Sequence, residues 1–164
     1  MTIDTEVCAL QKFRMFSEVE PGKLKLLAMV SDRVTFQPNE VIYHQGDASD
    51  AVYIVLNGEF KVSLDTKSGE VAFAEHIRGS LLGEAGVLCG MSRGVTITAQ
   101  TELTALRVER DTFLGLIKES PAFNLAVMKE LGRQIMDLNV ICADLVRRMP
   151  KDLAPADVAS IRAW

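Results

Sequence analysis

The chain of 164 residues is 48% hydrophobic and 24% charged, which predicts one globular domain, or one domain with a short appendage. Its formal net charge of −4 disfavours a dedicated nucleic-acid surface, because such a surface needs a basic face. No apolar run is long enough to span a bilayer, and three scattered cysteines, Cys8, Cys89 and Cys142, indicate reduced thiols in a cytoplasmic protein.

Helices are predicted at the start of the chain and strands after them. Apolar residues recur at helical spacing across residues 8–30, where Pro21 suits the first position of a second short helix. Residues 34–108 then show short apolar runs separated by turn signals, of which Asn57-Gly58 is the strongest. Regularly spaced short strands of this kind predict an antiparallel β jelly roll, so the expected fold class is mainly β with flanking helices.

The jelly roll is predicted to be followed by helices within residues 110–149 and by a short tail, residues 150–164. The longer helix is expected to run from Pro121 to Met149, where Pro150 ends it. Its apolar residues alternate at spacings of three and four, as in the seam of a coiled coil: Met128, Leu131, Ile135, Leu138, Cys142, Leu145 and Met149. A wide apolar stripe that packs on the barrel is the alternative.

Residues 79–94, called the Gly-rich segment below, contain five of the 11 glycines. Glycine lets backbone N–H groups approach a ligand closely, because no Cβ intrudes. Residues 85–89 are predicted to form one helical turn, whose free N–H groups attract an anion. Arg93 adds a planar fork of donors that matches two phosphate oxygens, and Glu84 suits a sugar hydroxyl. The segment therefore favours a nucleotide with sugar and phosphate close together over a plain turn with solvated charges.

The Gly-rich segment resembles the phosphate-binding cassette of cyclic nucleotide-binding domains, as in bacterial catabolite activator proteins and the regulatory subunits of cyclic-AMP-dependent protein kinase. The step of nine residues from Glu84 to Arg93 equals that of the kinase subunits. The runs Gln45–Asp47 and Tyr53–Glu59 also match family elements, which are structural there. The resemblance covers about residues 10–149, which we expect to form one domain from residue 1 to 149.

The resemblance implies that Glu84 binds the ribose 2′-hydroxyl and that Arg93 binds the cyclic phosphate. It also implies that the backbone amides around four further residues line the phosphate pocket: Gly83, Ala85, Gly86 and Gly94. The sequence departs from the usual pattern in three places, with Leu82 for an aromatic residue, Gly86-Val87 for Ala-Leu, and Gly94 for a residue with a small side chain. Cyclic-GMP-selective members often place a threonine after the arginine. Gly94 therefore favours cyclic AMP, with cyclic GMP as a second possible ligand.

The adenine base has two candidate caps. Aligned from Pro121, Leu138 and Asn139 fall where catabolite activator proteins use helix residues to contact adenine. The Asn139 amide carries both a donor and an acceptor, which suits the edge of adenine. Alternatively the tail caps the base and Trp164 stacks on it, as aromatic lids do in the kinase regulatory subunits.

The expected function is reversible binding of a cyclic nucleotide, without catalysis, cofactor or metal, and signalling through rearrangement of the C-terminal helices. Related bacterial regulators dimerise through the corresponding helix, so a homodimer through residues 121–149 is expected, together with a protein partner of unknown identity. Fifteen residues follow Met149, too few for a helix-turn-helix, so direct DNA binding is not expected. Because no apolar run could span a bilayer, no membrane contact is expected either.

Two other classes of protein stay open. One is a degenerate member of the same fold that has lost its ligand and acts as a dimeric scaffold for protein interaction, against which the intact Glu84 and Arg93 argue. The other is a cupin-like metalloenzyme. It would need a cluster of histidines, whereas His44 and His76 are the only two and lie on separate predicted strands.

Overall fold

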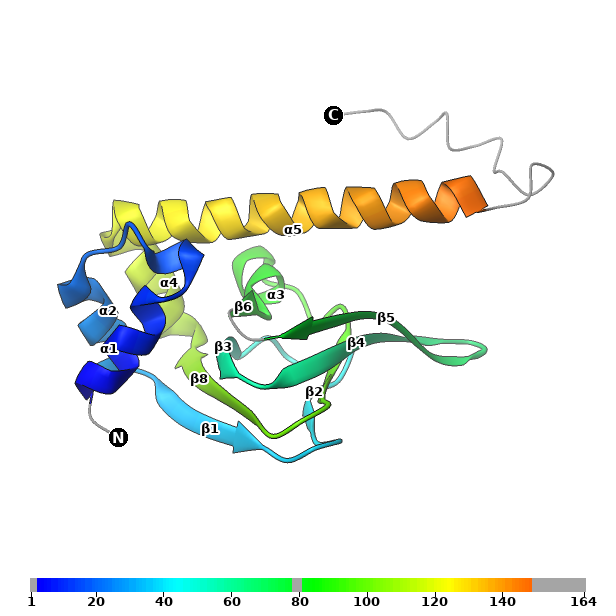
Figure 1. The fold of residues 1–164 in the computed structure, drawn as a ribbon, viewed down its shortest axis with the longest axis horizontal. Helices are drawn as coiled ribbons and strands as arrows, with labels where there is room; N and C mark the ends of the chain where they lie inside the picture. Colours follow the sequence, from blue (N-terminus) through cyan, green and yellow to red (C-terminus); the bar gives the residue numbers. More distant parts are fainter. Residues whose placement is uncertain (1–2, 78–80, 149–164) are drawn as a thin grey trace. The chain divides into compact units, whose positions relative to one another are not determined.

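The computed structural model describes residues 3–77 and 81–148 of the chain. The chain divides into two compact units, Met1–Val127 and Met128–Trp164. The helices and strands follow one another as labelled in Figure 1: α1 (Ile3–Gln11), η1 (Arg14–Phe16), α2 (Pro21–Met29), β1 (Asp32–Phe36), β2 (Val41–Tyr43), β3 (Ala51–Asn57), β4 (Glu59–Thr66), β5 (Gly69–Ile77), β6 (Leu81–Leu82), α3 (Glu84–Cys89), β7 (Thr96–Ala99), β8 (Leu103–Glu109), α4 (Arg110–Glu119) and α5 (Pro121–Arg148).

The strands of the first unit form two four-stranded antiparallel sheets, with the orders β1-β8-β3-β6 and β2-β7-β4-β5. Strands that neighbour each other in space are mostly distant in the chain, as in a jelly roll. The tight turn at Asn57-Gly58 joins β3 to β4, where Gly58 adopts a φ of 98°. The predicted fold class, an antiparallel jelly roll with N-terminal helices and a long C-terminal helix, is confirmed.

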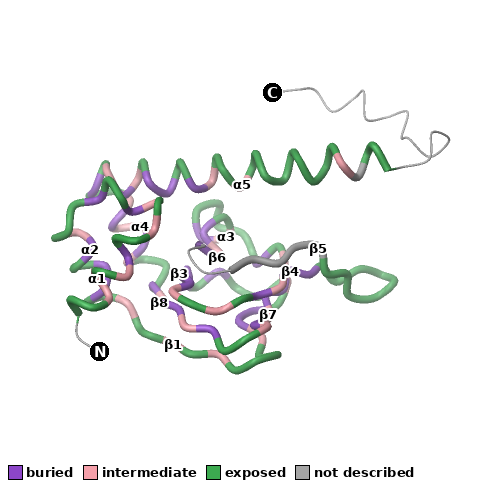
Figure 2. The backbone as a smooth tube through the Cα atoms, viewed as in Figure 1, coloured by how far each residue is buried: buried purple, intermediate pink, exposed green. Residues whose placement is uncertain are grey.

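The core of the jelly roll lies between the two sheets. Residues 51–55 of β3 are buried without interruption, which explains their nearly continuous apolar sequence. Figure 2 shows that buried residues also lie along β8, beside β3. The cluster is built from both sheets: Ile42, Tyr43, Ala51, Tyr53, Val55, Phe60, Val62, Leu82, Ile97, Ala99, Leu103 and Ala105.

A second set of buried contacts joins the helices of the first unit. The ring of Phe123, at the start of α5, stacks on Phe16 of η1 at a centroid distance of 6.0 Å. It also meets Phe113 of α4 edge-on at 5.9 Å. The start of α4 is fixed to the loop before β3, because the backbone N–H of Arg110 donates to the carbonyl of Asp50 at 2.8 Å. The start of α4 is thus held against the residue that precedes β3.

The first helix begins earlier than the sequence predicts, because α1 starts at Ile3 rather than near residue 8 and ends at Gln11. Acidic residues stabilise the positive end of a helix, and Asp4 and Glu6 occupy the first turn. Their carboxylates also lie near basic side chains from elsewhere in the unit, Asp4 at 3.9 Å from Lys25 and Glu6 at 3.5 Å from Arg33. These contacts account for the extra helical residues.

The described part of the second unit, residues 128–148, continues helix α5. Ion pairs within the helix support it, since Arg133 contacts Glu130 and Asp137, and Arg148 contacts Asp144. Most of its large apolar side chains are exposed, both on the predicted seam and off it: Met128, Ile135, Met136, Leu138, Val140, Ile141 and Val146. The seam residue Leu131 is half-buried.

Candidate functional site

The Gly-rich segment forms a turn followed by a short helix, as the sequence predicts. Gly83 leaves β6 with a left-handed φ of 81° and precedes α3, and Gly90 ends α3 with a φ of 66°. A Cβ at position 83 would clash with the guanidinium of Arg93, so the turn requires glycine in both conformation and space. Gly79 and Ser80 lie outside the described residues. Gly83 thus brings the Arg93 side chain against the start of α3.

Arg93 is almost completely buried beneath this turn. Its Nη1 donates to the carbonyl of Gly83 at 3.1 Å, and its Nη2 donates to the carbonyl of Ala51 at 2.6 Å. Nη2 also lies 3.4 Å from a carboxylate oxygen of Asp50, whereas the buried Nε has no hydrogen-bond partner among the described residues. The buried cation is therefore held mainly by neutral carbonyl oxygens. Its Nε–H donor is left without a partner among the described residues.

Backbone hydrogen bonds fix the main chain of Arg93 as firmly as its side chain. The N–H of Arg93 donates to the carbonyl of Asp47, and its own carbonyl accepts from the N–H of Gly46, each at 2.8 Å. Both partners belong to the glycine turn between β2 and β3. The sequence gives the Gln45–Asp47 run only a structural role. In the structure, the backbone of this run holds the main chain of Arg93.

Tyr43, at the end of β2, lies against the face of the Arg93 guanidinium, whose central carbon is 4.3 Å from the ring centroid. Burial raises the pKa of the Tyr43 phenol well above its usual value, the positive charge of Arg93 lowers it, and the negative charge of Glu84 raises it. The phenol is therefore neutral at physiological pH. Sequence reasoning missed Tyr43, since a strand tyrosine carries no local sign that its ring meets a cation.

Glu84 is the first residue of α3 and is buried. A carboxylate at this position is stabilised by the positive end of the helix. Its charge acts on the same Tyr43 phenol as that of Arg93. The structure therefore brings Glu84 and Arg93 together around Gly83 and Tyr43, although they lie nine positions apart in the sequence.

The other glycine positions of the segment differ in the space around them. A Cβ at Gly86 would clash with the hydroxyl of Ser49, which is buried and has no hydrogen-bond partner among the described residues. Gly94 is exposed, and nothing lies within 4 Å of the position of its Cβ. Ala85 is also exposed. Gly86 is thus constrained by its neighbours, whereas Gly94 is not.

Asp50 forms two ion pairs, which connect the buried Arg93 with Arg107. The two oxygens of Asp50 contact Nη2 of Arg93 at 3.4 Å and Nη2 of Arg107 at 3.0 Å. Arg107 also pairs with Glu109, and this bond is the main reason that the pKa of Arg107 is raised. Asp50 is largely exposed, so water weakens these contacts. They nevertheless link the buried cation to the end of β8, where α4 begins.

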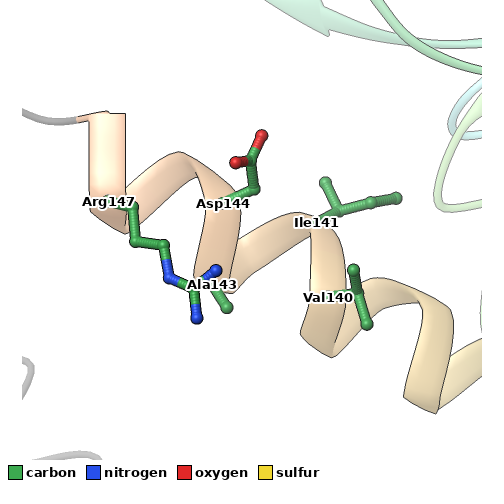
Figure 3. A pocket seen from close by; sticks show the side chains of 5 residues that line it. All are labelled: Val140, Ile141, Ala143, Asp144 and Arg147. Atoms are coloured by element: carbon green, nitrogen blue, oxygen red, sulfur yellow. The ribbon is translucent and has the colours of Figure 1, made fainter.

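The residues predicted to cap the base belong to the second unit. Leu138 and Asn139 lie on α5 and are exposed, and their contact with a base stays a prediction. Trp164, the alternative cap, lies outside the described residues. A hollow beside α5, shown in Figure 3, has a lining whose described residues are Val140, Ile141, Ala143, Asp144 and Arg147, none of which is a predicted site residue.

Among residues 3–77 and 81–148, no three or more His, Cys, Asp or Glu side chains lie together in a way that could hold a metal ion. Within these residues, no helix is both long and apolar enough to cross a membrane.

Comparisons with known proteins point in one direction. The family model for the cyclic nucleotide-binding domain matches residues 33–120. Lysophospholipase nte1 of Neosartorya fischeri is 34% identical over 133 residues, which cover 80% of this chain but only 9% of that protein. The catabolite activator protein of Thermus thermophilus has the same fold, with a TM-score of 0.70 at 23% identity over 80% of this chain and 62% of the other. The regulatory domain of Toxoplasma gondii PKA with cAMP gives 0.69 at 17% identity, over 77% and 49%.

Proposed function

Because this chain belongs to the cyclic nucleotide-binding domain family, we propose that it is a regulatory module that binds a cyclic nucleotide reversibly and catalyses no reaction. Cyclic AMP is the proposed ligand, and cyclic GMP is the second candidate. The solved Toxoplasma PKA domain of the same fold is a complex with cAMP, which agrees with this choice.

The observation that carries the proposal is the state of Arg93. A buried cation is costly unless a negative charge compensates it in the same dry environment. The hydrogen bonds of Arg93 run to the carbonyls of Gly83 and Ala51 and to the exposed carboxylate of Asp50. A phosphate that enters beside Gly83 would supply a full negative charge and accept from the unpaired Nε. The site thus favours an anion of phosphate geometry.

The remaining roles follow from the residues around Arg93. Glu84 would accept a hydrogen bond from the ribose 2′-hydroxyl, because a carboxylate repels a phosphate but suits a sugar. The backbone N–H groups that would line the phosphate pocket belong to four residues: Gly83, Ala85, Gly86 and Gly94. Leu138 and Asn139 of α5 are proposed as the cap on the base.

We further propose that ligand binding is signalled through α4 and α5. The backbone of Asp50 holds the N–H of Arg110 at the start of α4, and its side chain contacts Arg93. A phosphate bound to Arg93 would compete with the Asp50 carboxylate for the guanidinium, and Asp50 would pass this change to Arg110 at the start of α4. Such a ligand shifts the population toward the helix arrangement that it binds more tightly.

The exposed apolar residues of α5 support a homodimer through residues 121–149. A helix of this length in water gains most of its stability from packing of an apolar face. Exposed residues of this helix include Ile135 and Leu138 of the predicted seam. A second copy of the same helix would cover them in a coiled coil.

A further proposal concerns the kind of whole protein in which such a module would act. The chain spans 9% of the length of the lysophospholipase that it matches. A domain of this kind could therefore regulate an enzyme domain or an unknown protein partner. Co-purification of the chain with a candidate partner, with and without cyclic AMP, would test this.

Thermal unfolding with and without each nucleotide tests the binding proposal. At a cyclic AMP concentration of one hundred times the Kd, linkage stabilises the fold by about 2.7 kcal/mol, or about 5–10 °C in Tm. Arg93→Ala, measured at the same ligand concentration, should lose the shift. Absence of a shift with either nucleotide at millimolar concentration would contradict the proposal.

One observation favours the alternative, a degenerate scaffold without a ligand. Arg93 already donates to two carbonyls of its own chain, as it would if the pocket were permanently closed. In that case wild type and Arg93→Ala would respond identically to both nucleotides. The cupin-like metalloenzyme is tested separately by metal analysis of the purified protein.

A further inference from the structure

We infer that Tyr43 is a positioning residue of the candidate site, which holds the Arg93 guanidinium in the orientation that meets the phosphate. The inference rests on the proposed function and adds to it a residue that the sequence pattern did not suggest. It starts from the stacking of the Arg93 guanidinium on the Tyr43 ring, with 4.3 Å between the guanidinium carbon and the ring centroid.

Two kinds of contact together fix the guanidinium. The carbonyl oxygens of Gly83 and Ala51 accept from its two terminal nitrogens at 3.1 and 2.6 Å, which fixes two of its edges. The ring of Tyr43 covers one face, which prevents the plane from tilting. With these positions occupied, the direction of the unpaired Nε–H is set before any ligand arrives. Such preorganisation reduces the ordering that binding would otherwise require.

The ring is suited to this role because it stays neutral and is itself held in place. Tyr43 is only 8% exposed and packs on Tyr53 at a centroid distance of 6.1 Å. Burial raises the pKa of its phenol, so no titration near neutral pH disturbs the stacking. An aromatic face attracts a cation most strongly when both are shielded from water, as Tyr43 and Arg93 are.

The same contact could be incidental to a tyrosine that only fills the core. Tyr53 provides the matched control, because it is also 8% exposed and belongs to the same apolar cluster. Its ring packs on Tyr43 and Phe36, and its phenol acts on Arg107, whereas the ring that Arg93 stacks on is that of Tyr43. A purely structural role would make the two tyrosines equivalent in their effect on ligand affinity.

The test is calorimetric titration of the full chain with cyclic AMP, for wild type, Tyr43→Phe, Tyr43→Leu and Tyr53→Leu. Loss of a shielded cation–ring contact predicts about 5- to 30-fold weaker binding for Tyr43→Leu. Tyr43→Phe keeps the ring and should stay within about threefold of wild type, as should Tyr53→Leu. Thermal unfolding without ligand would show that the two leucine variants are comparably folded.

The outcomes separate the two hypotheses. If wild type binds and Tyr43→Leu binds equally well, or Tyr53→Leu loses as much, the inference is wrong and the proposed function stands. If wild type binds no cyclic nucleotide, both are wrong.

A ligand-free measurement covers the case in which Tyr43→Leu does not fold. The Nε–H resonance of Arg93, identified by its loss in Arg93→Lys, should be shifted upfield of the other arginine resonances by the ring current of Tyr43. The shift should persist in Tyr43→Phe. An unshifted resonance in wild type would overturn the inference.

Discussion

In the first unit, Phe16, Phe113 and Leu106 are at most 1% exposed, whereas Ile135 and Val140 of the second unit are 59% and 70% exposed. The first unit therefore encloses its own core, and within it the buried charges of the candidate site. The described part of the second unit is a helix whose apolar side chains meet water. The buried core and the buried charges thus belong to the first unit, whereas the apolar side chains of the distal helix are mostly left uncovered among the described residues.

The largest expected effect tests the self-contained core. Phe113→Ala removes a fully buried ring that contacts Phe123, and should lower the free energy of unfolding by about 3–5 kcal/mol. Ile135→Ala, in the exposed helix, should change it by no more than about 0.5 kcal/mol. Chemical denaturation at low protein concentration measures both. Equal losses would show that the distal helix contributes to the same core.

The next effect concerns the charges inside the first unit. Arg93→Ala should weaken cyclic AMP binding by about 2–5 kcal/mol, because it removes a desolvated partner of the phosphate. Glu84→Ala should cost about 1.5–3 kcal/mol, the value of one hydrogen bond to a charged group. Calorimetric titration of both variants with cyclic AMP measures the two losses in affinity. Equal small losses would mean that the phosphate binds elsewhere.

Much of this site could be predicted from the sequence because its signals are local. The glycines and the spacing from Glu84 to Arg93 fall within one segment, and the family resemblance drawn from them is confirmed. The order of strands and turns likewise predicted the jelly roll. Apolar periodicity predicted the long helix, and the observed α5 runs from Pro121 to Arg148.

The residues around the segment could not be predicted in the same way. Tyr43 meets Arg93 only because β2 pairs with β7, where Tyr43 opposes Ile97. Ser49 lies against Gly86, 37 positions further along the chain, through the packing of the turn before β3 on α3. Contacts of this kind depend on strand register and turn geometry, which no single stretch of sequence encodes.

The exposed helix gives the third prediction, a change in mass rather than in affinity. Leu131→Lys with Leu145→Lys places two charges on the predicted seam and should convert a dimer into a monomer, as measured by light scattering. Val140→Lys is the matched control, because Val140 is exposed on the same helix, as Ile135 and Leu138 are, but lies off the seam. A monomeric wild type, or an equal effect of Val140→Lys, would rule out the seam as the interface.

A smaller expected effect tests whether the second unit takes part in binding cyclic AMP. Asn139→Ala removes the amide proposed to contact adenine and should weaken cyclic AMP binding by about 0.5–1.5 kcal/mol. Deletion of residues 151–164 should leave the affinity unchanged. If only the deletion weakens binding, the tail and Trp164 cap the base instead of α5. If neither does, the ligand contacts lie entirely within the first unit.

The smallest effect lies at Gly94, where the choice of base would be set within the first unit. Nothing lies within 4 Å of the position of its Cβ, so a side chain can be added there without a clash. Gly94→Thr should leave cyclic AMP affinity unchanged and raise cyclic GMP affinity by about 1 kcal/mol, or about fivefold, if its hydroxyl reaches the guanine amino group. Gly94→Val has the same shape without the hydroxyl and should bring no gain. Competition between the two nucleotides measures the ratio. Equal behaviour of threonine and valine would show that position 94 does not read the base and that selectivity, if any, comes from α5.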